Sequence, residues 1–463
     1  MRRWVSLILL VAGLVAPYGN VAAQASGPTY IVQEDDTLIG IAEMFGVGLE
    51  DLIQANGIAD PSLIFPGSPL VIPGLEGVTG VLMTRPIGYG ESVRSLAIRS
   101  GVSDEVLIRL NHIVSPGRVY VGQPVIAPLS EENPAALGTA TLHLVERGEA
   151  ALALAVRNRV NPWAALLRLP SPGRLWAVPG TTLVIPGGDA PVSALPGPVT
   201  SVSGLPDPAV QGRTEVIRID LSAPAWAEGS LGPWPLGFHA LGSGDLVALQ
   251  GVHALAEPGM YDLGIRILDA EGGSVMDGFS QPVRVIDGGY LFDPPLSVPP
   301  ETIDPAVTGP EEELVLSIIS ASSPERLWDG PFQFPSLYTD AFPSRFGSRR
   351  NYNDSGYLYY HTGLDLYGGT TTEILAPAPG RVVFAGPLSV RGNTTFIDHG
   401  WGVLTGYLHQ SEIRVAVGDL VETGQAIGLV GATGRVTGAH LHWEIWVGGV
   451  PVDPLGWVAN AYP

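Results

Sequence analysis

The sequence predicts a multidomain protein whose C-terminal half is mainly β. Its 463 residues exceed what one hydrophobic core usually holds, so two to four domains are expected. A βααβ pattern repeats at the front, period-two alternation begins near Thr214, and glycine turns separate short strands from Phe334 onward. We therefore expect small βααβ modules, an antiparallel β-sandwich spacer and a β-rich C-terminal domain.

The composition favours folded modules and excludes one class of partner. Apolar residues make up 45% of the chain, so its 60 glycines and 42 prolines indicate many turns rather than disorder. The net charge is −21, and no basic stripe is present to bind phosphates, so we expect no nucleic-acid partner. The chain has no cysteine, so its modules are held by their cores. Composition leaves the oligomeric state open.

Residues 1–25 are predicted to be a signal peptide. Arg2 and Arg3 precede a short apolar run at residues 5–16, and Ala23-Gln24-Ala25 offers a cleavage site. A run of about a dozen apolar residues is too short to span a bilayer, and no later segment is long enough. We expect no membrane span after cleavage, and a secreted protein of the periplasm or of the cell wall and extracellular space.

Residues 28–74 form the first predicted βααβ module. A strand at residues 30–32 is followed by Asp35-Asp36-Thr37, which supplies helix N-cap groups. Apolar residues at helical spacing come next, and Gly46 ends the helix. A second helix, the Asn56-Gly57 turn and a strand at residues 70–72 complete it. Its D-T-L, I-A and I-P patterns resemble those of LysM modules. The resemblance implies binding to N-acetylglucosamine-containing glycans such as peptidoglycan; an ordinary small helical unit is the alternative.

The same frame recurs at residues 81–129 and, in degenerate form, at 139–187. Gly67 corresponds to Gly122 and Gly180, at intervals of 55 and 58 residues, which indicates tandem modules. Ser92 stands where the first module has Thr37, whereas the third module lacks the capping hydroxyl. We expect both modules to keep the fold, and glycan binding by either stays open. Several weak modules on one chain gain avidity.

The middle of the chain predicts a spacer between two linkers. Residues 188–212 are rich in proline and glycine and indicate a linker. Residues 213–293 alternate as strands at 217–221, 246–249, 261–268 and 283–286, which favours a small antiparallel, immunoglobulin-like sandwich. His239 and His253 are isolated there and are expected to be structural. Residues 294–330 indicate a second linker, with a short helix at 311–319.

The last domain, residues 331–463, carries the chemistry. Strands are predicted at 381–384, 394–398, 403–407, 426–430 and 441–446. His361 and Asp365 are four residues apart, and His440 and His442 are two apart, so each pair shares a face of its element. Imidazole and carboxylate groups bind zinc, and a catalytic zinc site uses three ligands and one open position. We expect the two pairs to close one site.

Four runs of this domain resemble the lysostaphin/LytM-type zinc endopeptidases: HTGLDL, IDHGWGVLTGYLHQ, VGDLVETGQAIGLVGATG and TGAHLHWEI. The resemblance implies one Zn²⁺ per catalytic domain, with His361, Asp365 and His442 as its ligands. It also implies that His409 and His440 are catalytic residues that do not bind the metal. The implied reaction is hydrolysis of peptide bonds in peptidoglycan stem peptides or cross-bridges. The residues that bind substrate are unknown.

Other positions and hypotheses complete this prediction. His399 belongs to the strand-turn signature of the family and is expected to be structural. A catalytically inactive scaffold or activator of cell-wall hydrolases is the competing hypothesis, although all five histidine and aspartate positions match. The sequence leaves open which bond is cut, which histidine is the general base and which groups support the metal ligands. Asn351 and Asn353 are candidates for a latency device at the open metal position.

Overall fold

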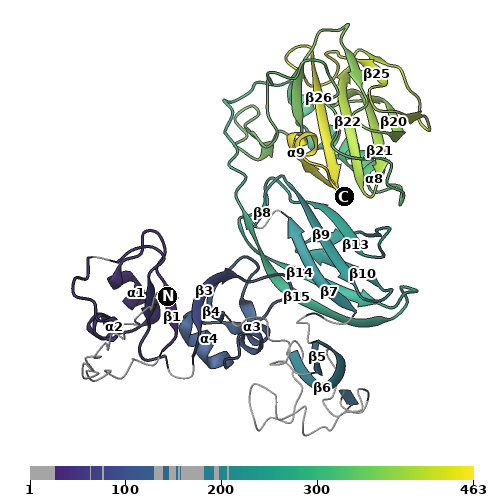
Figure 1. Cartoon of the computed structure of the whole chain (residues 1–463). Helices are drawn as coiled ribbons and strands as arrows, with labels where there is room; N and C mark the ends of the chain where they lie inside the picture. Colours follow the sequence, from purple (N-terminus) through teal and green to yellow (C-terminus); the bar gives the residue numbers. More distant parts are fainter. Residues whose placement is uncertain are drawn as a thin grey trace, which may run out of the picture.

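The computed structural model describes residues 27–62, 64–75, 78–129, 139–144, 153–154, 157, 182–191, 195, 198–205 and 208–463. The predicted signal peptide at residues 1–25 lies outside this range. Small helical modules stand at the N-terminal end and β-sheets fill the rest, which confirms the predicted fold class (Figure 1). Within the described ranges, no helix has both the length and the apolar character needed to cross a membrane.

The first two modules share one sheet and one core. Their strands pair in the order β2-β1-β3-β4, and the link between the modules is the parallel pair β1–β3. Thr37 Oγ1 accepts a hydrogen bond from Gly40 N at 3.1 Å, and Gly46 ends the helix with φ of 63°, as predicted. The elements are β1 (Thr29–Ile31), α1 (Leu38–Phe45), α2 (Leu49–Asn56), β2 (Pro69–Val71), β3 (Val81–Pro86), α3 (Val93–Arg99), α4 (Asp104–Leu110), η1 (Pro116–Arg118) and β4 (Pro124–Leu129).

An asparagine closes each of these modules in the same way. The Asn56 amide donates to the carbonyls of Leu52 and Val71 and accepts from Val71 N at 2.7 Å. Asn111 repeats these contacts 55 residues later, with Leu107 and Ile126 as partners. Each side chain therefore ties the end of the second helix to the closing strand. The contacts recur at the interval that the sequence indicated.

The third module is described only by its two strands. β5 (Thr139–Leu144) pairs antiparallel with β6 (Thr182–Pro191), and most of the predicted module at 139–187 lies outside the described residues. The expectation of a linker over 188–212 is wrong for part of its length, because β7 (Val199–Leu205) pairs with β9 (Thr214–Leu221). In β7 the buried apolar residues Val199 and Val202 are separated by threonine and serine and followed by serine and glycine, so the apolar alternation is weak.

The sandwich has two facing sheets around one core. It is not purely antiparallel, because β8 (Ala209–Val210) pairs parallel with β15. The four predicted strands fall on β9, β13, β14 and β15, whereas the short strands between residues 226 and 240 were not predicted. The first sheet contains β11 (Trp234–Leu236), β10 (Trp226–Leu231), β14 (Gly259–Leu268), β15 (Val275–Ile286) and β8; the second contains β12 (Phe238–Ala240), β13 (Leu246–Gly251), β9 and β7.

A longer helix than expected follows the sandwich. After η2 (Pro300–Thr302), α8 spans Pro305–Ile319, and Asp304 caps it by accepting from Ala306 N at 2.9 Å. The Gly309-Pro310 pair resembles a helix breaker, which is why the sequence placed the start near residue 311. Val315 and Ile319 bury one stripe of α8 against Phe396, Leu404 and Trp446. The helix therefore covers one face of the C-terminal sheet.

The C-terminal domain is built on a seven-stranded sheet. The five strands predicted for this domain fall on β20, β21, β22, β25 and β26. The path β18-β26-β22-β21-β20-β24 joins β18 (Leu364–Tyr367), β26 (His440–Val447), β22 (Val403–Gln410), β21 (Gly392–Gly400), β20 (Gly380–Leu388) and β24 (Leu420–Val421), while β27 (Val450–Val452) pairs with β26. A smaller sheet contains β19 (Glu373–Leu375), β25 (Ala426–Leu429) and β23 (Glu412–Ile413); β16 (Arg349–Arg350) pairs with β17 (Tyr359–Tyr360), and α9 (Pro454–Ala459) ends the domain.

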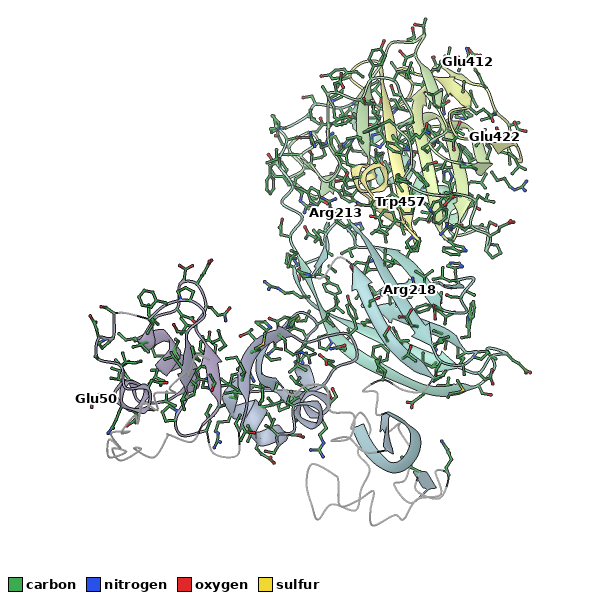
Figure 2. The ribbon with its side chains drawn as sticks, viewed as in Figure 1. Glu50, Arg213, Arg218, Glu412, Glu422 and Trp457 are labelled. Atoms are coloured by element: carbon green, nitrogen blue, oxygen red, sulfur yellow. The ribbon has the colours of Figure 1, made fainter. Side chains whose placement is uncertain are left out.

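The sandwich is packed against both of its neighbours. The C-terminal domain lies at one end of it and the N-terminal modules lie beside the other (Figure 1). On the module side, Tyr89 donates to Glu215 at 3.1 Å. On the other side, Trp457 Nε1 donates to Thr214 Oγ1 at 2.9 Å, at the junction where Figure 2 labels Trp457 and Arg213. Buried hydrogen bonds of this kind fix the direction of one domain on the next.

Candidate metal centre

Two neighbouring strands bring the predicted ligands together. β18 and β26 are antiparallel, with Asp365 directly opposite His442 and Tyr367 opposite His440. Directly paired residues point to the same face of a sheet, so Asp365 and His442 meet. His361 lies just before β18 and is held by backbone hydrogen bonds to Ser348 and Gly347. The two short motifs therefore close one site, as the sequence predicted.

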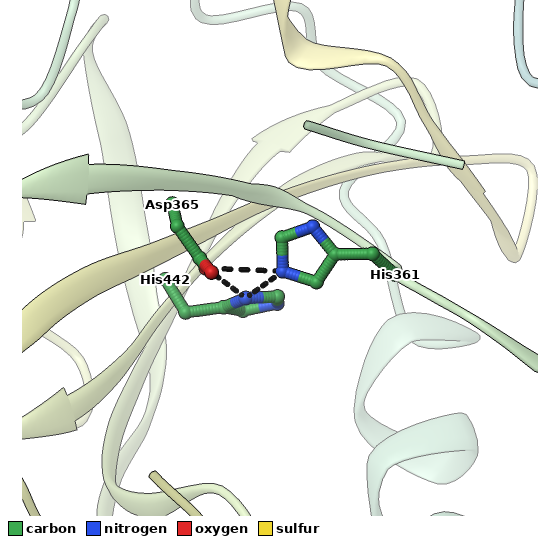
Figure 3. A group of neighbouring side chains, drawn as sticks. All are labelled: His361, Asp365 and His442. Atoms are coloured by element: carbon green, nitrogen blue, oxygen red, sulfur yellow. Dashed lines mark hydrogen bonds and ion pairs between the residues drawn. The ribbon is translucent and has the colours of Figure 1, made fainter. Parts of the chain in front are cut away.

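Three atoms of this site form a small triangle (Figure 3). His361 Nε2 lies 3.0 Å from Asp365 Oδ1 and 2.9 Å from His442 Nδ1, and His442 Nδ1 lies 2.9 Å from Asp365 Oδ1. All three side chains are buried. Within the described ranges, no other trio of histidine, cysteine, aspartate or glutamate side chains converges in this way. Two ring nitrogens and a carboxylate oxygen at such distances match the ligand set of a catalytic zinc site.

Groups behind the triangle fix which nitrogen of each ring faces it. His361 Nδ1 lies 2.9 Å from the Arg345 carbonyl oxygen, so this nitrogen carries the proton and Nε2 faces the site. His442 Nε2 lies 3.2 Å from Glu444 Oε1, so Nε2 donates there and Nδ1 faces the site. Such partners orient metal-binding imidazoles and raise their basicity. Three electron-rich atoms therefore converge, and their mutual repulsion favours a cation among them.

Protonation of His442 provides one such positive charge. Burial lowers the pKa of His442, but hydrogen bonds to Asp365 and Glu444 outweigh burial and raise the pKa to about 9. Burial opposes the charge of Asp365, yet His361 and His442 hold its pKa well below the usual range. A divalent ion held by His361, Asp365 and His442 would take the place of that proton and supply a larger positive charge to the same three atoms. The residues therefore fit a metal ion.

Glu444 is a supporting residue that the sequence argument missed. Burial raises the pKa of Glu444, but its hydrogen bond with His442 and the charge of Arg391 outweigh burial and lower the pKa to about 2. Thr362 Oγ1 donates to this carboxylate at 2.6 Å and Trp446 Nε1 donates at 2.9 Å. Glu444 is therefore an ionised, fully engaged group behind the metal ligand. The sequence did contain a sign of this role, because His440, His442 and Glu444 alternate along one strand and so share a face.

Two further histidines stand on the rim of the triangle. The ring of His409 lies 5.2 Å from that of His440 and 5.9 Å from that of His442, centroid to centroid, and His440 Nε2 lies 3.6 Å from Asp365 Oδ1. His409 Nδ1 donates to the Thr433 carbonyl at 2.8 Å, and His440 Nδ1 donates to the Gly438 carbonyl at 2.9 Å. Nε2 is therefore the nitrogen that each ring has left for proton transfer, and in His440 it lies near Asp365. Burial lowers the pKa of His409 to about 3, with help from His442 and His440, so this ring is neutral near pH 7.

The remaining predicted positions serve packing. His399 is fully buried between the Pro379 carbonyl at 2.7 Å and Thr405 Oγ1 at 2.8 Å, which confirms its structural role. The latency hypothesis for the two asparagines is not supported. The Asn353 side chain exchanges hydrogen bonds with the Val298 backbone, and Asn351 Oδ1 accepts from Gly356 N, so both side chains are engaged away from the triangle.

The isolated histidines of the sandwich lie at its junction with the C-terminal domain. His239 stacks on Trp401 with centroids 4.8 Å apart. His253 Nε2 lies 3.3 Å from the Tyr360 hydroxyl, and the two rings meet edge to face. Neither histidine joins a group of ligands within the described residues. Both therefore serve the contact between domains.

Comparisons with known proteins fit this geometry. Residues 359–454 match the profile of peptidase family M23, and residues 30–73 and 87–128 match that of the LysM domain. The C-terminal domain is a peptidase family M23 domain. All three ligand-bearing residues and both rim histidines fall within the M23 segment. The two resemblances drawn from the sequence, to LysM modules and to this group of peptidases, are confirmed.

Curated relatives of the M23 domain carry the names of peptidases. The chain is 43% identical over 95 residues to DD-carboxypeptidase/endopeptidase Mpg of Neisseria meningitidis serogroup B, covering 20% of this chain and 22% of that protein. It is 37% identical over 112 residues to peptidoglycan DD-endopeptidase ShyB of Vibrio cholerae serotype O1, covering 24% and 26%. The chain thus matches about a quarter of the length of these curated relatives. A solved structure of a putative M23 peptidase from Pseudomonas aeruginosa aligns with a TM-score of 0.42 at 24% identity, covering 56% of this chain and 97% of that one.

Proposed function

We propose that this protein is an exported zinc metalloendopeptidase that cuts peptide bonds in peptidoglycan stem peptides or cross-bridges. The observation that carries the proposal is the triangle of His361, Asp365 and His442, whose facing atoms lie 2.9 to 3.0 Å apart with the rings of His409 and His440 beside them. These three residues would hold the metal. When bound, a zinc ion acidifies a water molecule and polarises the scissile carbonyl.

The residues of the chain supply the proton transfers. His409 is neutral near pH 7 and keeps Nε2 free, because Nδ1 is committed to the Thr433 carbonyl. Its Nε2 is therefore unprotonated and open to the proton of the attacking water. His440 is more exposed, with Nδ1 committed to the Gly438 carbonyl and Nε2 near Asp365. In the form that carries a proton on both nitrogens, its Nε2–H can be given to the leaving amine and can stabilise the developing oxyanion. Asp365, held ionised, neutralises charge at the centre.

The LysM domains define the expected substrate. Glycan-binding modules at the front and a peptidase domain at the back fit one polymer that contains both sugars and peptides. We infer that the LysM pair holds the sugar strand while the M23 domain cuts the attached peptides. The relatives named DD-endopeptidases favour the same type of bond for this chain. Residues 1–25 fit export to this substrate.

The competing hypothesis is a catalytically inactive scaffold or an activator of cell-wall hydrolases. A scaffold needs no aligned metal ligands, no buried carboxylate behind them and no pair of histidines with fixed tautomers. The chain keeps all of these groups. Their presence favours the enzyme.

Digestion of defined muropeptides by the purified mature chain tests the proposal. We expect about one zinc ion per chain, and products that show cleavage of a peptide bond by mass spectrometry. Removal of the metal with a chelator should stop the reaction, and added Zn²⁺ should restore it. A chain that holds zinc and cuts no muropeptide would support the scaffold instead. A pull-down of residues 27–129 with insoluble wall tests the LysM part separately, because these two modules share one core.

A further inference from the structure

Helix α8 precedes the M23 segment and carries one buried carboxylate. Glu311 is 6% exposed, whereas its neighbours Glu312 and Glu313 face solvent. Glu311 Oε2 accepts from Val390 N at 2.7 Å, and Oε1 accepts from Arg391 N at 3.1 Å and Arg391 Nη1 at 3.0 Å. Hydrogen bonds to an ionised acceptor are about twice as strong as neutral ones. One side chain of α8 therefore holds the turn between β20 and β21.

That turn supports His409 through the backbone. The Arg391 carbonyl accepts a hydrogen bond from His409 N at 3.0 Å. His409 has φ of 64°, a left-handed conformation that costs energy for a residue other than glycine. A strained residue keeps its conformation only where its surroundings hold it. The Arg391 carbonyl is one of those constraints, and Glu311 fixes the two peptide groups that directly precede it.

A second loop locks the ring of the same histidine and is tied to the same turn. Thr433 offers its carbonyl to His409 Nδ1 at 2.8 Å, and its hydroxyl accepts from Asn393 N at 2.9 Å. Arg435 N donates to the Val390 carbonyl at 2.8 Å. Gly392 lies so close to Thr433 that a Cβ atom there would stand 2.4 Å from its backbone. The turn and the loop are therefore tied to each other, and the position of residues 390–391 determines both.

We propose that Glu311 is a positioning residue for His409. Glu311 holds the turn at residues 390–391. This turn holds the backbone of His409 and the Thr433 carbonyl that accepts from its ring. These contacts keep Nε2 of His409 directed at the metal triangle. The proposal rests on the catalytic role proposed for His409. It gives α8, which lies outside the segment matched to family M23, a part in the reaction.

Three variants of α8 in the full-length mature chain test this inference. Glu311→Gln places an amide NH₂ group against a backbone N–H, so one of the two oxygen acceptors that hold residues 390 and 391 is lost. Val315→Ala weakens the packing of the same helix without touching the turn, and Glu313→Gln alters an exposed carboxylate. We expect Glu311→Gln to lower kcat about tenfold or more with little change in KM, because small displacements of a catalytic group are costly. Zinc content should stay at the wild-type value in all three variants.

Amide hydrogen exchange gives a readout that needs no activity. We expect faster exchange at Val390, Arg391 and His409 in Glu311→Gln, and wild-type exchange there in Glu313→Gln and Val315→Ala.

A Val315→Ala chain with an equal or larger loss of melting temperature and an equal loss of kcat would overturn the inference. So would wild-type kcat or wild-type exchange in Glu311→Gln. If the wild-type chain cuts no muropeptide, the proposed function fails, and the exchange experiment still decides whether Glu311 controls His409. Glu311→Asp, with a shorter carboxylate, replaces Glu311→Gln if that variant does not fold.

Discussion

Each histidine of the metal centre has one ring nitrogen bound to a specific partner. Backbone carbonyls of Arg345, Thr433 and Gly438 accept from three of them, and Glu444 accepts from the fourth. The free nitrogen of each ring then faces the centre as an acceptor. Backbone carbonyls set the tautomer without adding charge, whereas Glu444 adds a full negative charge behind His442. The ligand with the charged partner is therefore the most basic of the site.

Removing a ligand and removing a rim histidine should have different effects. We expect His442→Ala to lose both zinc and hydrolysis, because two ligands hold the ion too weakly. His440→Ala should keep the zinc and lose turnover by about 10² to 10⁴-fold, the usual contribution of acid–base catalysis. Metal analysis and muropeptide kinetics on both variants measure this. Zinc loss in His440→Ala would move that residue into the ligand set.

Metal binding should release a proton from His442. Its pKa of about 9 means that the metal-free centre holds this proton at pH 7, and a metal ligand must be deprotonated. We expect zinc uptake to release about one proton at pH 7, and apparent affinity to rise with pH until it levels off above about 9. Calorimetry in buffers of different ionisation enthalpy measures the release. An affinity that is independent of pH between 6 and 9 would contradict the raised pKa of His442.

The site could be predicted from side chains but not from backbone partners. His361, Asp365, His440 and His442 were found because their spacing places them on shared faces of strands. Glu444 continued the same alternation and was missed, since a charged residue in a strand normally faces solvent. The carbonyls of Arg345 and Thr433 have no sequence signature, because any residue offers a carbonyl and only the fold places it.

At the scale of elements, the first two modules share a hydrogen-bond pattern more closely than they share residues. The first two modules keep an asparagine that ties the second helix to the closing strand, although the strands read Leu-Val-Ile in one and Val-Ile-Ala in the other. Strand β7 shows the opposite case, since its pairing with β9 holds it although its composition resembles a linker. Tertiary pairing decides such segments, and the sequence alone does not show it.

Replacing either asparagine should destabilise the modules to a similar extent. Asn56→Ala leaves the Val71 N–H and two carbonyls without their partner, and Asn111→Ala does the same at Ile126. We expect each change to lower the free energy of unfolding by about 1–3 kcal/mol. Chemical denaturation measures this, with Gln54→Ala on the exposed face of α2 as control. An effect of Asn56→Ala no larger than that of the control would show that water replaces the lost partner.

At the scale of the whole molecule, consecutive domains are joined by direct contacts. The parallel pair β1–β3 and a common core join the two LysM domains, and the Gln281 side chain donates to the carbonyls of Gly88 and Glu91 across the next junction. Gln250 and Trp457 cross the junction between the sandwich and the M23 domain. Contacts of this kind hold the LysM domains and the M23 domain at a set separation (Figure 1).

Gly251 is the position where this arrangement can be opened by one change. A Cβ atom there would stand 2.8 Å from Val452 Cγ1 and 2.9 Å from Val450 Cβ, both in the M23 domain. Leucine cannot fit this contact, so we expect Gly251→Leu to force the sandwich and the M23 domain apart at a cost of about 1–3 kcal/mol. Small-angle scattering should show a larger maximum dimension.

Gly264→Leu, in another strand of the sandwich with open space around its Cβ position, is the matched control and should leave the profile unchanged. A Gly251→Leu chain with the wild-type profile would mean that the two domains are held by the rest of the junction alone.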